Sequence, residues 1–265
     1  MGKALELIGA SGTAISATIS PLTAVTGDSL AVRAGSQDKR IDLVQFWTDV
    51  QVAGTARIRS ARMHDNVQGI RVDTIISDLF PLMPPGIRQR LYPNDVIVAE
   101  LAGSAVAGDV EYLLMLLLYE DLAGAAGRFI AEEELKRRGQ NIFSVENTIA
   151  TGATPAWAGS EALNAEFDQF HAGGQYALVG YVVDTEVPAI GYRGPDTANY
   201  RVGGPGIETD RATTSDWFMW LSRMLNEPLI PVISAENKAG TLIDALQDEN
   251  GADVTVTSFF VELSK

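Results

Sequence analysis

Short runs in which apolar residues recur at every position or at every second position cover most of the chain, and they predict strands. Residues 41–52 are rich in Val, Phe, Trp, Ile and Leu, and Gly54 ends this run. Residues 55–60 place Arg57 and Arg59 at alternate positions, and a two-residue period is typical of a strand with one solvated face. Similar patterns predict further strands at 69–72, 95–100, 175–183, 187–192, 229–233, 241–246 and 254–263.

The longest apolar run covers residues 112–119 and is followed by Glu120 and Asp121. A helix that spans a bilayer needs about 20 apolar residues, so this shorter run predicts a buried element of a folded protein. Leu and Met are good helix formers, and the run taken alone is compatible with either a helix or a strand.

The two halves of the chain resemble each other, which fits either an internal repeat or chance similarity between two β-rich halves, and the comparison favours one kind of element for that run. Residues 41–46 and 176–181 open the two halves with similar apolar sequences, 135 positions apart (176 minus 41). Near the ends of the halves, residues 108–122 and 252–263 share an Asp-Val start, an apolar body and an acidic residue before Leu. The second of these segments is rich in β-branched and aromatic residues, which favours a strand. The first is therefore expected to be a strand as well.

A helical segment separates the halves. Residues 128–139 carry their acidic residues ahead of most of their basic ones, which suits the helix dipole, and Gly139 is a suitable C-terminal stop. The small and Pro-containing stretch 148–160 follows, and a second helix at 160–170 is compatible with the sequence.

The predicted fold class is all-β, with two tandem antiparallel β-sandwiches, jelly-roll-like, joined by a short helical connector. We assign residues 1–122 to an N-terminal sandwich with an extended arm, 123–165 to the connector and 166–265 to a C-terminal sandwich. The small and polar residues 11–20 within the arm also fit a strand.

Loops and turns are expected where Pro, Gly and Asn accumulate. Residues 81–86 and 195–206 are rich in Pro and Gly and are predicted to be loops. Asn250 followed by Gly251 predicts a tight hairpin turn. Residues 217–225 are apolar and fit either a strand or a helix.

Composition and charge narrow the classes of function. The chain is 46% hydrophobic and has no Cys, which leaves out disulfides, Cys-ligated zinc and thiol nucleophiles. The formal net charge of −14 disfavours direct nucleic-acid binding, which relies on Lys and Arg. Residues 1–90 sum to +2 and residues 91–265 to −16. This asymmetry fits either a solvated acidic surface or attraction between the Arg-bearing region of one subunit and the acidic region of the next.

The sequence carries no catalytic signature. Its two histidines, His64 and His171, fall one in each half, too few for the metal site of a cupin-type enzyme, which uses several His. Asp65 follows His64, but adjacent residues rarely give the geometry of a catalytic triad. Motifs for phosphate loops, dinucleotide binding, zinc proteases and nucleophile elbows do not occur. We therefore predict no catalytic, cofactor-binding or metal-binding residues, no cofactor and no enzymatic activity.

Two further groups of residues leave alternatives open. Four acidic residues offer oxygen ligands for calcium or act as solvated turn residues, namely Asp244, Asp248, Glu249 and Asp253. Four aromatic residues fit a sugar-binding platform, or packing in a core or a subunit interface, namely Tyr192, Trp217, Phe218 and Trp220.

With two similar sandwich halves, a helical connector and long Pro/Gly segments, the chain resembles the double jelly-roll major capsid proteins of icosahedral bacterial and archaeal viruses. The resemblance is one of architecture over most of the chain, and no functional residue is carried over with it. It implies a structural virion protein, a coat subunit that self-assembles into an icosahedral shell through trimeric, pseudo-hexameric capsomers.

The same resemblance implies the partners. They are further copies of the chain (a homotrimer within a larger shell), other virion proteins and an internal membrane, with no direct contact to nucleic acid. The segments 81–86 and 195–206 and the terminal arm are expected to contact neighbouring subunits.

A second interpretation of the sandwiches is a carbohydrate- or receptor-binding module of a phage fibre or a secreted protein. Such a module would expose an aromatic platform and remain a small oligomer, whereas a coat protein would form large shells.

Overall fold

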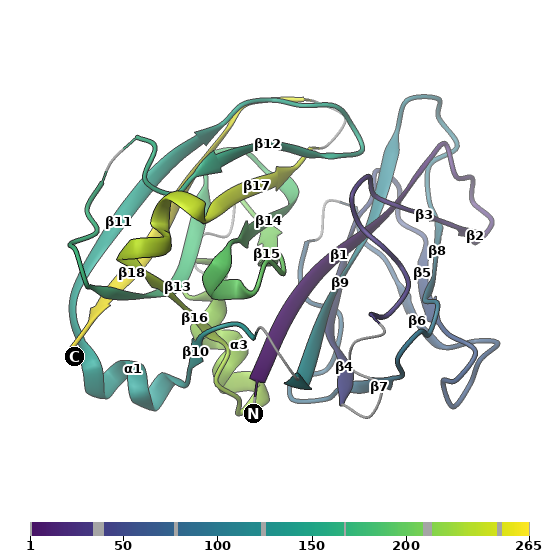
Figure 1. Cartoon of the computed structure of the whole chain (residues 1–265). Coiled ribbons are helices and arrows are strands. Elements are labelled where there is room, and N and C mark those ends of the chain that lie inside the picture. Colours follow the sequence, from purple (N-terminus) through teal and green to yellow (C-terminus); the bar gives the residue numbers. More distant parts are fainter. Residues whose placement is uncertain are drawn as a thin grey trace.

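The structure is a computed structural model that describes residues 2–33, 40–76, 79–122, 126–166, 168–208, 214–247 and 251–264. Its strands form two sandwiches, each made of two antiparallel sheets (Figure 1). In the first sandwich, one sheet has the order β3 (Thr23–Ala24), β1 (Gly2–Thr13), β9 (Val110–Leu122), β4 (Ile41–Asp49) and β7 (Gln89–Leu91). The facing sheet has the order β2 (Ser20–Pro21), β8 (Val98–Ala102), β5 (Thr55–Arg59) and β6 (Ile70–Asp73).

The second sandwich is built in the same way. One sheet has the order β10 (Phe129–Ile130), β16 (Ile230–Ser234), β13 (Gln175–Val183), β18 (Val254–Leu263) and β11 (Gly139–Ile149). The facing sheet has the order β12 (Trp157–Ala162), β17 (Leu242–Leu246), β14 (Val187–Arg193) and β15 (Val202–Gly206). The helical elements are α1 (Glu132–Arg138), η2 (Pro195–Thr197), α3 (Trp217–Leu225) and η3 (Ala235–Gly240).

Both sandwiches have the strand order of a jelly roll. In the described residues, and apart from the short β3 and β10, each sandwich has eight strands, and its first, eighth, third and sixth strands form one sheet. The second, seventh, fourth and fifth form the other. The predicted fold class is therefore confirmed. The repeat also holds, because β4 and β13 are both third strands and β9 and β18 are both last strands.

The four sheets lie in layers across the molecule (Figure 1). The sheet containing β1, β9 and β4 has the inner face of its own sandwich on one side. On its other side, β9 contacts β14 and β1 contacts β15 of the second sandwich. Along the stack, the sheet with β5 and β8 comes first, then the sheet with β1 and β9, then the sheet with β14 and β15, and last the sheet with β11 and β18. The sheet with the second and seventh strands thus precedes the sheet with the first and eighth strands in both sandwiches. The two sandwiches are therefore packed head to tail, with unlike sheets in contact.

This arrangement buries β9 on both faces. Leu113, Met115 and Leu117 belong to the core of the first sandwich, whereas the intervening residues at 114, 116 and 118 belong to a core that is continuous with the second sandwich. A strand buried on both faces has a continuous apolar sequence, which explains the long run at 112–119. In β18, by contrast, buried and partly exposed positions mostly alternate.

Two expectations about irregular segments are corrected by the strand pairing. Residues 2–13 are not an extended arm, because β1 pairs with β9 along its length. β15 occupies the end of the segment 195–206, which was predicted to be a loop. A Cβ atom on Gly203 would lie 2.0 Å from the carbonyl oxygen of Ile190, so glycine is needed here for close approach of two strands.

The connector also contains less helix than the sequence allowed. Helix α1 ends at Arg138, and Gly139 is its C-cap residue, in agreement with the C-terminal stop predicted from the sequence. However, β11 and β12 lie within 123–165 and pair with β18 and β17 of the second sandwich. The polar residues of β11 face solvent at alternate positions. The segment therefore lacks the apolar character by which the other strands were predicted. Residues 160–166 and 168–170 contain the end of β12 and no second helix.

Of the remaining local predictions, residues 81–86 form a loop and residues 217–225 form helix α3. The hairpin turn predicted at Asn250 lies outside the described residues.

Double burial of β9 predicts that neighbouring positions are equally sensitive. Leu113→Ala and Leu114→Ala should each lower the free energy of unfolding by about 3 kcal/mol, because both side chains are fully buried on opposite faces. Thr257→Ala, on the solvent side of β18, should change it by less than about 0.5 kcal/mol. Urea unfolding measures all three. A near-neutral Leu114→Ala would contradict the packing of the second sandwich on this face.

An ion pair that joins α1 to α3 predicts a pH effect. Both oxygens of Glu132 accept hydrogen bonds of 2.8 Å from Arg223, and this contact, with help from Lys136, lowers the pKa of Glu132 to about 2. Its stabilising effect is therefore complete above about pH 4.5 and is lost as the pH falls towards 2. Between pH 5 and 2 the wild type should lose about 1 kcal/mol more than Glu132→Gln, since both cations are largely exposed.

The matched control for this pH experiment is Glu133→Gln, which alters an exposed neighbour on the same helix. Its stability should follow the wild-type pH profile. An equal pH dependence in Glu132→Gln and the wild type would show that the ion pair does not stabilise the connector helix.

Candidate functional site

The sandwiches meet at a junction held by buried polar contacts. The indole Nε1 of Trp47 donates a 2.9 Å hydrogen bond to the carbonyl oxygen of Pro188. The hydroxyl of Tyr112 donates a 2.6 Å bond to the carbonyl oxygen of Gln247. Trp47 also packs edge-on against Trp217, with ring centroids 6.1 Å apart. Because these groups are directional and removed from water, they fix one orientation of the two sandwiches.

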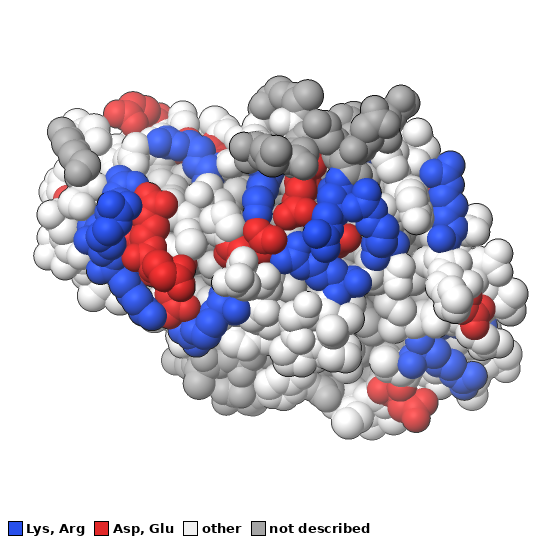
Figure 2. Space-filling view, turned by 90° about the horizontal axis from the view of Figure 1, so that it is seen from below, with Lys and Arg blue, Asp and Glu red and all other residues white. Residues whose placement is uncertain are grey.

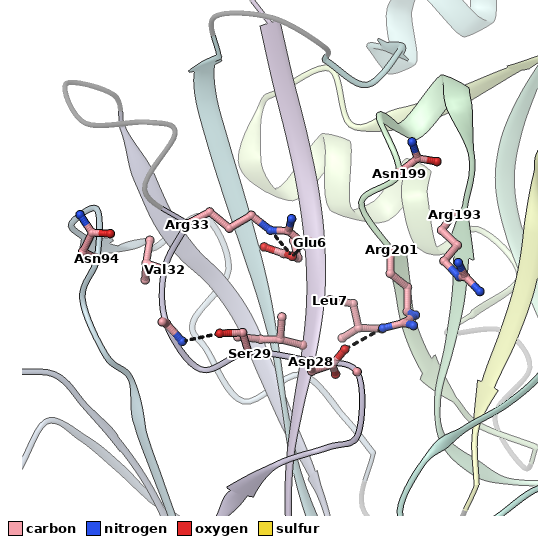
Figure 3. A pocket seen from close by; sticks show the side chains of 13 residues that line it. Glu6, Leu7, Asp28, Ser29, Val32, Arg33, Asn94, Arg193, Asn199 and Arg201 are labelled. Carbon is pink, nitrogen blue, oxygen red and sulfur yellow. Dashed lines mark hydrogen bonds and ion pairs between the residues drawn. The ribbon is translucent and has the colours of Figure 1, made fainter.

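A cavity of about 680 Å³ opens beside this junction. Its lining comes from β1, from the loop 27–33, and from residues 193, 199 and 201 of the second sandwich. In Figure 3, Glu6 and Arg33 meet on one side of the β1 strand, and Asp28 and Arg201 meet on the other. The cavity therefore exposes charged groups from both halves of the chain.

Arg201 is the centre of the network on the second-sandwich side. Its Nη1 lies 2.7 Å from Oδ1 of Asp28, and its Nε lies 3.1 Å from Oδ2 of Asp244. The guanidinium stacks 4.0 Å from the ring centroid of Trp157, which itself donates a hydrogen bond to Asp28. Burial raises the pKa of Asp28, although Arg201 acts in the opposite direction. One guanidinium thus ties together two carboxylates and an indole from both sandwiches.

A second network lies on the first-sandwich side. Glu6 accepts hydrogen bonds from Arg33 Nε (2.7 Å) and from the hydroxyl of Tyr119 (2.7 Å). Arg33 also lies 4.7 Å from the ring centroid of Tyr200. Both carboxylates among the described lining residues, Glu6 and Asp28, are thus held by arginines, and that lining contains no histidine. These paired charges suit a structural seam between the two sandwiches.

A third set of ion pairs lies beneath the junction. Arg88 Nη2 is 2.9 Å from Oε1 of Glu227 and donates a 3.0 Å bond to the carbonyl oxygen of Leu225. Lys3 also pairs with Glu227. Seen from below, blue and red side chains lie next to each other on this face of the molecule (Figure 2). Its cations are therefore largely neutralised by local carboxylates and do not form a purely basic patch.

Among the described residues, no further sheet packs on the outer faces of the two end sheets of the stack. On β5, Arg57 and Arg59 both contact Glu100 of β8, at 2.5 and 2.9 Å. On the outer face at the other end, Ile142 of β11 is 70% exposed. The equivalent face of the first sandwich is covered by the second sandwich. The end faces are therefore candidate contact surfaces.

The histidines lie in separate sandwiches. His64 is exposed in a turn of the first sandwich. The neighbouring carboxylate of Asp65 accepts the backbone N–H groups of Gln68 and Val67, which lowers the pKa of Asp65. His171 lines a hollow of about 590 Å³ in the second sandwich.

The acidic residues considered as calcium ligands have different partners in the structure. Asp244 is buried and held by Arg193 and Arg201, and Asp253 accepts a backbone bond from Thr151. The other two, at 248 and 249, lie outside the described residues. Within the described part of the chain, no group of three or more His, Asp or Glu side chains could hold a metal ion.

The aromatic residues pack and form no platform. Tyr192, Trp217 and Phe218 are fully buried. Trp220 stacks on Trp217, with ring centroids 5.1 Å apart. Sequence reasoning did not identify Arg201, Asp28 and Glu6 as a cluster. Their separation along the chain offered no local signal.

No family model matches this chain, and no curated protein matches it either. Among solved structures, the chain is similar to one titled "PBSX exported protein XepA", with 13% sequence identity and a TM-score of 0.27. The match covers 97% of this chain and 86% of the other. At that TM-score the likeness supports no conclusion about fold or function. No helix in the described residues is long and apolar enough to cross a membrane.

The junction network predicts a strong difference between arginine and lysine. Arg201→Lys should lower the free energy of unfolding by about 2 kcal/mol, because an ammonium cannot bridge two carboxylates while stacking on an indole. Arg71→Lys, at an exposed position of β6, should change it by less than about 0.5 kcal/mol. Urea unfolding followed by Trp fluorescence measures both. Equal effects of the two substitutions would show that Arg201 is not a structural bridge.

Proposed function

We propose that this protein is a structural coat subunit of a virion that assembles with further copies of itself into a shell. The observation that carries the proposal is the head-to-tail packing of two jelly rolls with the same strand order. Jelly-roll sandwiches are common in viral capsids, although other proteins use them too. Further support comes from the two sheets that lie at the ends of the stack.

A head-to-tail contact joins two different surfaces, and it can be repeated from one unit to the next. In this chain, the sheet with β1 and β9 of the first sandwich meets the sheet with β14 and β15 of the second. At each end of this stack lies a sheet, one of each kind, on whose outer face no further sheet of the described residues packs. Repetition of a similar contact between copies, with rotation at each step, would close a ring. Three chains would supply six sandwiches, which is the trimeric, pseudo-hexameric capsomer that the resemblance implies.

The chemistry of the cavity and the charge distribution agree with this proposal. The paired carboxylates and arginines of the junction stabilise a fixed shape and lack the features of a catalytic site. The first 90 residues sum to +2 and the remainder to −16, so the two ends of the stack would attract each other between copies. Such a coat would contact other virion proteins and an internal membrane, and would not bind nucleic acid directly.

Assembly of the purified full chain tests the proposal. We expect light scattering after gel filtration to show trimers or larger species, and negative-stain microscopy to show ring-shaped or shell-like particles. Raising NaCl from about 0.05 to about 0.5 M should shift the population towards smaller species, because salt screens exposed charges. A monodisperse monomer at all protein and salt concentrations would contradict the proposal. A small oligomer that binds glycans would favour the carbohydrate-binding interpretation.

A further inference from the structure

A polar hollow opens at one end of the second sandwich, where β18 ends and β11 begins (Figure 1). It has two parts, of about 590 and 400 Å³, and His171 and Glu262 line both of them. One wall is the segment 168–175, and the other is formed by the ends of β11 and β18. Pockets of about 300 to 1,000 Å³ are typical of sites for small ligands, so each part has a suitable size.

The strand register places the floor of this hollow on the inner face of its sheet. The even-numbered residues of β18 from Val254 to Phe260 are buried inside the sandwich, so Glu262 continues this face at the end of the strand. Phe143 of β11 pairs with Phe260, and their rings stack with centroids 5.7 Å apart. Tyr176 of β13 pairs with Glu262. Side chains from three adjacent strands therefore reach the hollow on the same face.

Hydrogen bonds hold the opposite wall in place. The hydroxyl of Tyr176 accepts a 2.7 Å bond from the backbone N–H of His171. The ammonium of Lys238 contacts both carboxylate oxygens of Asp168 and donates a 3.2 Å bond to the carbonyl oxygen of Phe170. A site whose walls are fixed in this way loses little conformational entropy when it binds a ligand.

Four carboxamide side chains line the hollow. Gln140 and Gln175 line the larger part, and Asn141 and Gln169 line the smaller part. A carboxamide has no charge and carries two N–H donors and an oxygen acceptor. A hydroxyl group also donates and accepts hydrogen bonds, so a ligand rich in hydroxyl groups can use both functions of each amide.

The charges of the hollow disfavour an anionic ligand. Arg138 is bonded to Glu134 at 2.8 Å, and Asp168 is held by the ammonium described above. Glu262 accepts a 2.8 Å hydrogen bond from Nδ2 of Asn141, and its second oxygen has no partner among the described residues. An anion would therefore meet carboxylates without an unpaired cation, whereas a hydroxyl group can donate to that second oxygen.

One aromatic ring adds an apolar surface to this polar lining. Phe143 packs against Phe170 and Tyr176, whose rings lie nearly perpendicular to it with centroids 5.6 and 5.4 Å away. It remains partly exposed and lines the smaller part of the hollow. Sugar rings combine hydroxyl groups with apolar C–H surfaces, and ligand sites commonly join aromatic side chains to a few polar groups. The lining thus matches both kinds of surface on a sugar.

A peptide in an extended conformation fits this place less well. Such peptides commonly bind by pairing with a free strand edge, and β11 is an edge strand of its sheet. However, the Nε2 of Gln169 donates a 2.8 Å bond to the carbonyl oxygen of Ser144. The backbone N–H of Thr148 donates a 2.7 Å bond to Oε1 of Glu166. Side chains of the same chain therefore occupy backbone groups that a peptide strand would need.

We propose that this hollow binds an uncharged, hydroxyl-rich ligand, namely a neutral carbohydrate. The sugar hydroxyls bond to the carboxamides and to Glu262, and an apolar face of the sugar packs on Phe143. Jelly-roll sandwiches occur in lectins as well as in viral capsids. The hollow belongs to one sandwich and includes no residue of the junction between the sandwiches. Carbohydrate binding therefore goes beyond the proposed coat function and does not depend on it.

A glycan microarray followed by calorimetry tests this proposal on the full chain. On an array that carries neutral, sialylated and sulfated oligosaccharides, we expect binding to neutral ones. The best neutral oligosaccharide is then titrated in solution, and its binding should persist in about 0.5 M NaCl, because salt does not screen an uncharged ligand. Failure to bind any neutral oligosaccharide would overturn the proposal. Binding confined to anionic glycans and lost in salt would overturn it too.

Matched substitutions locate the site. Asn141→Ala and His171→Ala should each weaken binding of that oligosaccharide at least about fivefold, because each removes a polar group of the lining. Asn66→Ala and His64→Ala, in a turn of the first sandwich, should leave the affinity unchanged. All four side chains are exposed, so thermal unfolding should match the wild type in every variant. Equal affinities of the four variants would show that this hollow is not the binding site.

Binding and assembly are measured separately, so the two proposals fail separately. Shells that bind no neutral oligosaccharide would overturn the carbohydrate site and leave the coat function standing. A chain that stays monomeric but binds through Asn141 and His171 would overturn the coat function and confirm the carbohydrate site.

Discussion

The structure depends on one sheet that is buried on both faces. β9, with β1 and β4 beside it, supplies side chains to the core of the first sandwich and to the core shared with the second. Parallel sheets are usually buried in this way, whereas antiparallel sheets commonly keep one face in water. Here an antiparallel sheet has apolar residues on both sides because another sandwich takes the place of solvent. The two halves are therefore joined by hydrophobic burial and not only by their connecting segment.

Polar contacts give this apolar junction its orientation. The hydrophobic effect is non-directional, and a flat apolar face would tolerate several arrangements of the second sandwich. Trp47 and Tyr112 donate hydrogen bonds to backbone carbonyls across the junction, and Arg201 bridges Asp28 and Asp244. A shifted arrangement would leave these buried donors and charges without partners, at a considerable cost in free energy.

The duplicated halves have different surroundings. The second sandwich covers the outer face of the sheet that contains β9. The outer face of the equivalent sheet, which contains β18, is partly exposed. Helix α3 covers β13 and β16 in the second sandwich, whereas in the first sandwich the loop residues Leu82 and Met83 hydrogen-bond to Phe46 and Gln45 of β4. Equivalent positions in the two halves therefore have different neighbours.

The sequence by itself determined the local elements and the repeat. Alternating positions gave most strands, the order of charges and Gly139 gave helix α1, and the similarity of the two last strands resolved residues 112–119 as β9. These features depend on neighbours along the chain. The tertiary structure alone decided that β1 is a sheet strand, that Gly203 lies in buried β15, and that β11 belongs to a sheet. It also decided the Arg201 network, whose partner Asp28 is 173 residues away. Such contacts depend on which surfaces meet after folding, and residues that are distant in sequence carry no local pattern of their future neighbours.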